Sequence, residues 1–261
     1  MNSNVLKSSV IKVGLIGLLL ALISACVSDA PTGRDTSYGE TKVTERARAH
    51  TELGSAYYQQ NKLEIALDEF SHAAEIDPNY GQAYNGLGLV YEALGETAKA
   101  DASFKKAVQV QPNNSESHNN YGNFLCTTKR YDESIVQYLE AVKNPLYATP
   151  NLAYANAGIC SARKNDLANA EVYLNKALAI EPLTHSAAYY LADIQFKRND
   201  VALAKKTLQN ALIASPSPET LWLGIKIERI MGDKDNEASY ALQLRQQYPK
   251  SEQAKLLLSG Q

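Results

Sequence analysis

Few side chains in this 261-residue chain could carry out chemistry, and their spacing limits what that chemistry could be. There are three cysteines and four histidines, with no C-x-x-C motif, no H-E-x-x-H motif and no glycine-rich phosphate-binding loop. We therefore predict no metal centre, no cofactor and no small-molecule substrate. The 26 Lys and Arg against 28 Asp and Glu make the chain weakly acidic, which argues against nucleic acid as the main partner.

The histidines and acidic residues do not form a catalytic set. His50 and His118 occupy the same position of the sequence repeat described below, where other repeats carry Tyr, and we interpret them as packing residues. His72 and His185 are isolated from the cysteines and from each other in that repeat, and the acidic residues are scattered along polar faces. We predict a non-enzymatic protein; a pocket uniting two acidic residues and a histidine would favour the enzymatic alternative.

The N-terminus carries a secretory signal, which we predict over residues 1–25. Lys7 and Lys12 precede the uncharged apolar stretch 13–23, and small residues follow it. As a helix, this stretch would span about 16 Å, against roughly 30 Å for the hydrocarbon core of a bilayer. It is therefore too short for a transmembrane anchor.

Cys26 is the candidate lipidation site. The sequence Ile23-Ser24-Ala25-Cys26 looks like a bacterial lipobox, in which the cysteine is acylated and becomes the first residue after cleavage. Several acyl chains give a stable anchor. Val27 replaces the Asp that similar lipoproteins use for retention in the inner membrane, which predicts the periplasmic face of the outer membrane. The alternative is an ordinary signal peptide with a cysteine there by chance.

Residues 26–46 separate this site from the first repeat. They are rich in Ser, Thr, Gly, Asp and Pro and show no apolar periodicity. We predict a flexible tether with a root-mean-square span of about 25 Å.

A repeat of 34 residues organises the rest of the chain. Six of the nine prolines recur at spacings of 34, 33, 37, 34 and 33, at positions 78, 112, 145, 182, 216 and 249. This is the tetratricopeptide pattern. It predicts an all-α, right-handed superhelical solenoid of six helix–turn–helix repeats within 47–252. The repeats are 47–80, 81–114, 115–148, 151–184, 185–218 and 219–252, with a two-residue insertion at Thr149-Pro150 and a C-terminal tail over 253–261.

The side chains inside each repeat explain the pattern. In the second repeat, positions 7, 8, 11, 20, 24, 27 and 32 carry Leu87, Gly88, Tyr91, Ala100, Phe104, Ala107 and Pro112. Small residues at positions 8 and 20 let two antiparallel helices approach closely. Positions 4, 7, 11, 24 and 27 form the apolar seam, and the proline ends the second helix.

The sixth repeat departs from this pattern. Lys226, Arg229 and Arg245 fall at positions 8, 11 and 27 of the frame 219–252, which predicts a hydrated seam of the kind found in terminal repeats. The last segment, 251–261, can add one short helix.

Cys126 and Cys160 lie at positions 12 and 10 of the first helices of the third and fourth repeats. Neighbouring repeats stack in a solenoid, so a disulfide between them can form in an oxidising compartment. Closing this loop would stabilise the fold by about 3–4 kcal/mol in the entropic model. The alternative is two buried free thiols.

The first helix of each repeat lines the concave face through positions 2, 5, 9, 12 and 13, and this is where we expect a partner. Amides there can pair with the backbone of an extended peptide, and apolar side chains can anchor it. A Lys/Asn clamp for a terminal carboxylate is absent from the first repeat. The candidate groove residues are Thr51, Ser55, Tyr58, Asn85, Leu89, Asn119, Asn123, Ile159, Tyr189 and Phe196. The alternative for any one of them is solvated surface.

Several segments resemble the PilF or PilW family of type IV pilus biogenesis lipoproteins. Besides the lipobox and six repeats, they are Asn119–Cys126, Arg130–Asp132, Asn144–Tyr147, Asn156–Cys160, Trp222–Ile225 and Tyr240–Leu244. The resemblance implies a pilotin, which binds the secretin subunit of the pilus machine and promotes its outer-membrane localisation and multimerisation. The alternative function is a periplasmic adaptor for peptidoglycan synthases or hydrolases.

Overall fold

The computed structural model describes residues 36–213 and 216–260, which are helical with short connections. The predicted signal peptide and Cys26 lie outside the described residues. The helices are α1 (Thr36–Gln59), α2 (Leu63–Ile76), α3 (Gly81–Ala93), α4 (Thr97–Val110), α5 (Ser115–Thr127), α6 (Tyr131–Ala141), α7 (Pro150–Arg163), α8 (Leu167–Ile180), α9 (His185–Lys197), α10 (Val201–Leu212), α11 (Pro218–Met231), α12 (Lys234–Gln247) and α13 (Glu252–Leu258).

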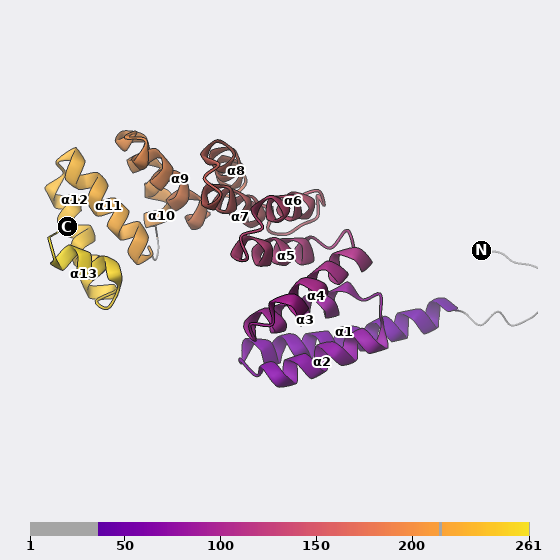
Figure 1. Cartoon of the computed structure of the whole chain (residues 1–261). Helices are drawn as coiled ribbons and strands as arrows, with labels where there is room; N and C mark the ends of the chain where they lie inside the picture. The colour runs from indigo at the N-terminus through magenta and orange to yellow at the C-terminus, as the bar shows by residue number, and fades with distance from the viewer. Residues whose placement is uncertain (1–35, 214–215, 261) are drawn as a thin grey trace, which may run out of the picture.

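The helices form six consecutive antiparallel pairs, and each pair stacks on the next to make an all-α solenoid (Figure 1). The fold predicted from the 34-residue repeat is therefore confirmed. Pro150 opens α7 after the predicted insertion, and α13 is the short terminal helix predicted within 251–261.

Close packing inside the first five pairs depends on the small residue at position 8. A Cβ on Gly88 would lie 2.6 Å from Cδ1 of Phe104, and a Cβ on Gly122 would lie 2.7 Å from Cδ1 of Tyr138. Both distances are shorter than carbon atoms tolerate, so the glycine lets the ring at position 24 lie against the backbone of the first helix. The small residues at position 20, among them Ala66 and Ser134, are fully buried.

The turn between the two helices of a pair uses a left-handed residue at position 15 in the first five repeats. Their φ angles are 58° at Asn61, 75° at Gly95, 65° at Lys129, 67° at Asn165 and 68° at Asn199. Glycine and asparagine adopt this conformation readily, whereas the Lys129 side chain is sterically disfavoured in it.

The flexible tether predicted over residues 26–46 is wrong for residues 36–46, and the rest of that segment lies outside the described residues. α1 begins at Thr36, so residues 36–46 of the segment predicted as tether are helical. Two contacts, one in this extension and one at the first residue of the first repeat, hold α1 on the end of α2. Ala47 is fully buried in a cluster with Ala73, and the Thr44 hydroxyl donates a 3.0 Å hydrogen bond to Asp77. No proline interrupts this extension, which allows the helix to continue through it.

The sixth repeat begins at residue 218, one residue earlier than predicted. α11 starts at Pro218, and the left-handed Gly232 that follows it is the fifteenth residue of a repeat that starts at 218, as Gly95 is the fifteenth residue of the second repeat. The shift arises because the last two repeat prolines are 33 residues apart rather than 34.

The hydrated terminal seam predicted from the frame 219–252 is consequently wrong. In the observed register the seam is mostly apolar, with Leu221, Ile225, Ala241, Leu244 and Ala254 in one buried cluster. Its one charged residue is Glu228 at position 11, which is 2% exposed and pairs with Lys205 at 2.6 Å. The three basic side chains lie one residue further along, outside this cluster. Lys226 is partly buried over the Phe196 ring, and Arg229 and Arg245 are exposed.

Candidate partner-binding groove

A hollow of about 730 Å³ lies on the inner side of the first two hairpins, between α1 and α3, and reaches Glu116 of α5. Half of the ten predicted groove residues line it: Thr51, Ser55, Tyr58, Asn85 and Leu89. They meet because positions 5, 9 and 12 of an α-helix lie along one face, and stacking sets that face of α1 beside the same face of α3. This hollow, with its lining residues, is called the N-terminal groove below.

The wall of the N-terminal groove is shaped by Phe70 of α2 and Gly86 of α3. A Cβ on Gly86 would overlap the Phe70 ring, so only glycine allows this ring to lie between the first and second repeats. Phe70 is 2% exposed, and its ring also packs against Gly54 of α1. The ring thus gives the groove a rigid apolar wall.

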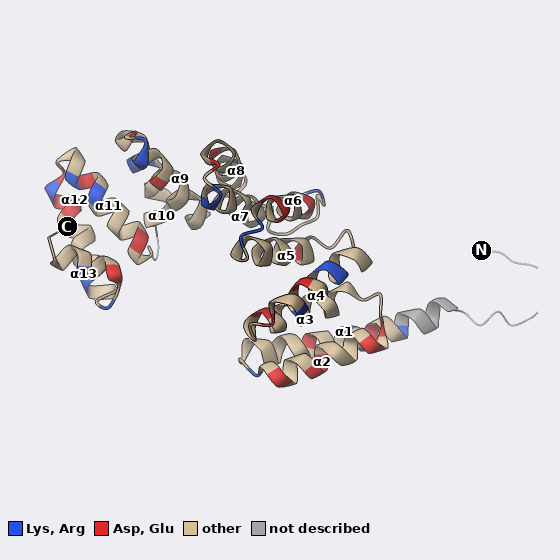
Figure 2. Cartoon of the chain, viewed as in Figure 1, with Lys and Arg blue, Asp and Glu red and all other residues tan. Residues whose placement is uncertain are grey.

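The charged groups that line the N-terminal groove are two acids and one base. Glu52 and Glu116 line it together with Arg48, whose guanidinium lies 3.6 Å from Glu52 in an exposed ion pair. Figure 2 shows acidic segments on the first two hairpins, with basic segments between them. The groove therefore favours a segment that is neutral or basic.

Glu92 extends this acidic character along α3, one turn beyond Leu89. Burial raises the pKa of its half-buried carboxyl, and a hydrogen bond with the Thr127 side chain partly opposes the shift. Burial, and secondarily the nearby Glu92 charge, also raise the pKa of the Tyr58 hydroxyl. Tyr58 thus remains a neutral hydroxyl that can donate a hydrogen bond at any physiological pH.

The other predicted residues are not part of this hollow. Asn119 lines a separate hollow of about 530 Å³, beside the loop that carries Leu146. Tyr189 lines a third one of about 360 Å³, together with Glu219. Leu146 is 88% exposed, which makes it the most exposed of the large apolar side chains recorded for the described residues.

Three predicted residues are engaged in contacts within the protein. Asn123 accepts a 2.8 Å hydrogen bond from the Tyr138 hydroxyl, and Ile159 packs against the core of the fourth and fifth repeats. Nζ of Lys226 lies 5.1 Å from the centroid of the Phe196 ring, within the range of a cation–π contact. The structure therefore does not bring the ten residues together in one cavity.

The asparagines of the concave face also bond to one another between repeats. Nδ2 of Asn120 donates to Oδ1 of Asn85 at 3.2 Å, and Nδ2 of Asn156 donates to Oδ1 of Asn119 at 3.2 Å. Position 6 of one repeat thus bonds to position 5 of the preceding repeat. The carbonyl groups of Asn85 and Asn119 are used in stacking, which leaves their amide N–H groups for a partner.

Cys126 and Cys160 form a disulfide in the structure, with their Cα atoms 5.9 Å apart. It joins α5 to α7, and both residues lie in a buried cluster with Tyr138 and Ala157. This cross-link fixes the third repeat on the fourth.

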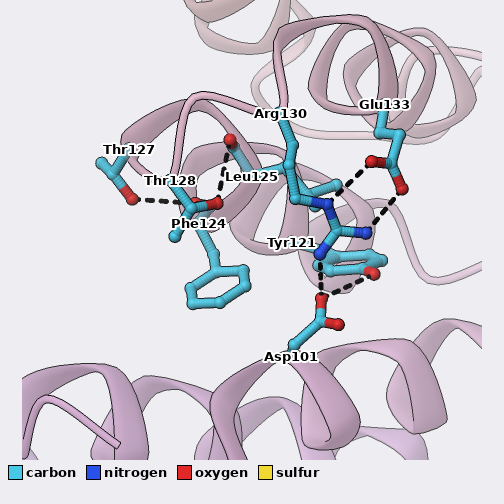
Figure 3. Close-up of polar contacts among 8 residues, drawn as sticks. All are labelled: Asp101, Tyr121, Phe124, Leu125, Thr127, Thr128, Arg130 and Glu133. Atoms are coloured by element: carbon cyan, nitrogen blue, oxygen red, sulfur yellow. Dashed lines mark hydrogen bonds and ion pairs between the residues drawn. The ribbon is translucent and has the colours of Figure 1, made fainter. Parts of the chain in front are cut away.

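A network around Arg130 fixes the second repeat on the third (Figure 3). Its guanidinium donates to Asp101 of α4 at 2.6 Å and to both carboxylate oxygens of Glu133 at 2.7 and 2.5 Å. The Tyr121 hydroxyl also donates to Asp101, at 3.0 Å. Burial, and then the Asp101 charge, raise the pKa of Tyr121 to about 12. This role of Arg130 was not predicted from the sequence, in which the segment Arg130–Asp132 was the available signal.

The histidines interpreted as packing residues differ in their surroundings. His118 is 7% exposed, and its two ring nitrogens lie 2.7 Å from Oε1 of Gln137 and 2.9 Å from the Pro112 carbonyl. His50 is partly exposed beside Glu69.

Between residues 36 and 213 and between 216 and 260, none of the helices is both long enough and apolar enough to cross a lipid bilayer.

Models of the tetratricopeptide repeat match residues 54–95, 81–114, 103–136 and 162–219. The six stacked hairpins and these matches define the class: the chain is a tetratricopeptide-repeat protein.

Comparison with related proteins identifies the family to which the chain belongs within this class. The chain is 31% identical to the type IV pilus assembly protein PilF of Pseudomonas aeruginosa, over 92% of its own length and 95% of that protein. It resembles a solved structure of P. aeruginosa PilF with a TM-score of 0.76, at 30% identity and covering 84% of this chain and all of that one. A crystal structure of the type IV pilus biogenesis factor PilW matches with a TM-score of 0.71, at 29% identity, over 81% of this chain and 98% of that one. The chain belongs to the PilF family of type IV pilus biogenesis proteins.

Proposed function

We propose that the protein is a non-enzymatic outer-membrane lipoprotein, a pilotin, that binds the secretin subunit of the type IV pilus machine. Binding promotes the outer-membrane localisation and multimerisation of the secretin. The observation that carries this proposal is the N-terminal groove, with a volume of about 730 Å³, in a chain that belongs to the PilF family.

The lining of the N-terminal groove suits an extended peptide with apolar anchors. Tyr58 and Leu89 supply amphipathic and apolar contact area, and Asn85 supplies amide donors for a peptide backbone. Glu52 and Glu116 border the groove, so a secretin segment with a basic residue near its anchors is the best match in charge.

A lipid on Cys26 would keep this groove near the membrane. Cys26 lies ten residues before Thr36, the first residue of α1. Ten residues reach at most about 35 Å when fully extended. The first two hairpins would therefore lie close to the membrane in which the secretin must assemble.

The test is to delete the gene and to restore it with variants, scoring secretin multimers in outer-membrane fractions and twitching motility. We expect the deletion to abolish both, and the wild-type gene to restore both. Cys26→Ser should release the protein into the soluble periplasm, and Tyr58→Ala with Leu89→Ala should stay anchored yet fail to restore multimers. Val172→Ala, on the exposed side of α8, is the matched control and should restore them.

Two results would contradict the proposal. One is a deletion strain with normal secretin multimers. The other is co-purification of the protein from detergent extracts with peptidoglycan synthases or hydrolases and without secretin, which would favour the adaptor function.

A further inference from the structure

Two histidines and a glutamate meet on the first hairpin, and none of them lines the N-terminal groove. His50 comes from α1, and Glu69 and His72 come from α2. Nδ1 of His50 lies 2.7 Å from Oε2 of Glu69, and the two imidazole rings lie edge to face with centroids 5.8 Å apart. One ligating atom from each of the three residues lies within 4.8 Å of the other two. We propose that these residues bind a divalent transition-metal ion, for which Zn²⁺ is the best match.

The geometry of the repeat explains why these residues meet. They occupy positions 4, 23 and 26, and the same positions are in contact in other repeats. In the third repeat, Nδ1 of His118 lies 2.7 Å from Oε1 of Gln137, as at positions 4 and 23 of the first. In the second, Nζ of Lys106 at position 26 lies 5.7 Å from the Tyr84 ring at position 4. Among the residues that the structure describes, only the first repeat places three metal-ligating side chains there.

The ligand types suit zinc. Imidazole nitrogen and carboxylate oxygen bind Zn²⁺ at about 2.0–2.2 Å, and two histidines with one glutamate leave a fourth position for water. Glu69 and His72 form a Glu-x-x-His pair on one helix face, a spacing used for metal ligands in helical bundles. The third ligand comes from the facing helix, so a bound ion would cross-link α1 to α2.

The side chains are free enough to close around an ion. Atoms that share a tetrahedral ion lie about 3.4 Å apart when each bond is about 2.1 Å. To bind one ion, Nδ1 of His50 and Oε2 of Glu69 would therefore move apart by less than about 1 Å, and the His72 ring would move towards them. The side chains of His50 and Glu69 are 36% and 19% exposed, and His72 is exposed, so solvent and ions reach all three.

The neighbouring histidine in the equivalent position lacks these features. His118 is buried, and both of its ring nitrogens lie at hydrogen-bond distance from protein oxygens. Its partner at position 23 is the amide of Gln137, which is a poor ligand for zinc compared with a carboxylate. His118 thus shows that packing alone requires neither the glutamate nor the second histidine found in the first repeat.

The test is zinc binding by the untagged full chain, purified in detergent and stripped of metal, in competition with a chromophoric chelator. We expect one equivalent of Zn²⁺ per chain. Glu69→Gln and His72→Gln should each weaken binding at least about tenfold, since each removes one of three ligands. His185→Gln, an exposed histidine outside the cluster, is the control and should bind as the wild type does.

Zinc should also raise the melting temperature of the wild type, because an ion bound only to the folded state stabilises it. Circular dichroism of the metal-free variants checks that they are folded. The proposal is overturned if the wild type binds no stoichiometric zinc, or if folded Glu69→Gln and His72→Gln bind it as tightly as the wild type.

Discussion

The first two hairpins and the middle of the solenoid are built from the same repeat, but the first two enclose an open hollow whereas the middle is cross-linked. Between α1 and α3, small side chains such as Ser55 and Gly86 leave a hollow of about 730 Å³ on the concave side. Between α5 and α7, the Cys126–Cys160 disulfide joins the two helices within a buried cluster. The helix pairing is unchanged, so the difference lies in a few side chains at the junction between repeats.

This contrast indicates that the middle of the solenoid provides rigidity and that the first two hairpins provide the binding surface. The middle junctions are held by the disulfide and by Arg130, which fixes the angle between the second and third repeats. The N-terminal groove depends on that angle, because Glu116 of α5 borders it. A rigid middle therefore keeps the N-terminal groove open for a partner.

The largest effect is expected from Gly88→Trp, which disrupts the close packing of the two helices of a hairpin, a feature that both regions share. An indole cannot fit where even a Cβ lies 2.6 Å from Phe104, so the second repeat should lose its native packing, at a cost of about 3 kcal/mol or more. Chemical denaturation followed by circular dichroism measures the loss. Ala93→Trp, at the exposed end of α3, is the matched control. Identical unfolding curves for Gly88→Trp and the wild type would contradict the repeat register.

The next largest effect is expected from removing the disulfide, which cross-links the middle of the solenoid and not the first two hairpins. The double variant Cys126→Ala/Cys160→Ala opens a loop with a sequence separation of 34 and should lower the free energy of unfolding by about 3 kcal/mol. Reduction of the wild type should produce a similar loss. Denaturation under oxidising and reducing conditions measures both. If mass spectrometry finds two free thiols in protein from the periplasm, the alternative of unbridged cysteines holds instead.

A smaller effect is expected at the junction between the second and third repeats. Arg130→Met keeps the aliphatic length and removes the contacts with Asp101 and Glu133, for a loss of about 1 kcal/mol, since the groups are partly exposed. Lys143→Met, which removes an ion pair within one segment, should change stability less. Equal losses in the two variants would show that the Arg130 network does not fix the junction.

The smallest effect concerns Glu92, which follows the N-terminal groove along α3, and depends on pH. Burial raises the pKa of Glu92 in the folded state, so its charge destabilises the fold wherever the carboxyl is ionised. Glu92→Gln should raise the melting temperature at pH 7, and this gain should disappear as the pH falls below about 4.5, where both states hold the proton. The exposed Glu64→Gln is the control. A gain that is independent of pH would contradict the assignment to burial of the charge.

The repeat pattern was sufficient to predict the fold because its constraints are local. A glycine at position 8, a ring at position 24 and a proline after the second helix define one hairpin, as Gly88, Phe104 and Pro112 do. Stacking of the hairpins then follows. The errors arose where the pattern is interrupted. The helical extension from Thr36 precedes the first repeat, and the 33-residue spacing before Pro249 shifted the sixth repeat by one residue.

The candidate site was less predictable, because its residues act across repeats. The frame placed Tyr58 and Leu89 on the concave face, and the structure sets them on one hollow. It could not show that Asn85 accepts a hydrogen bond from Asn120, or that Phe196 lies under Lys226, each from the next repeat. Such contacts depend on the angle between hairpins, which the repeat spacing does not specify.

The most direct test of the central claim is site-specific photo-cross-linking in cells. A photoreactive residue at Tyr58, inside the N-terminal groove, is compared with one at Val172, which is 50% exposed on α8. We predict a cross-linked product with the secretin subunit from position 58 and none from position 172. Secretin captured from position 172 and not from position 58 would contradict the groove as the binding surface.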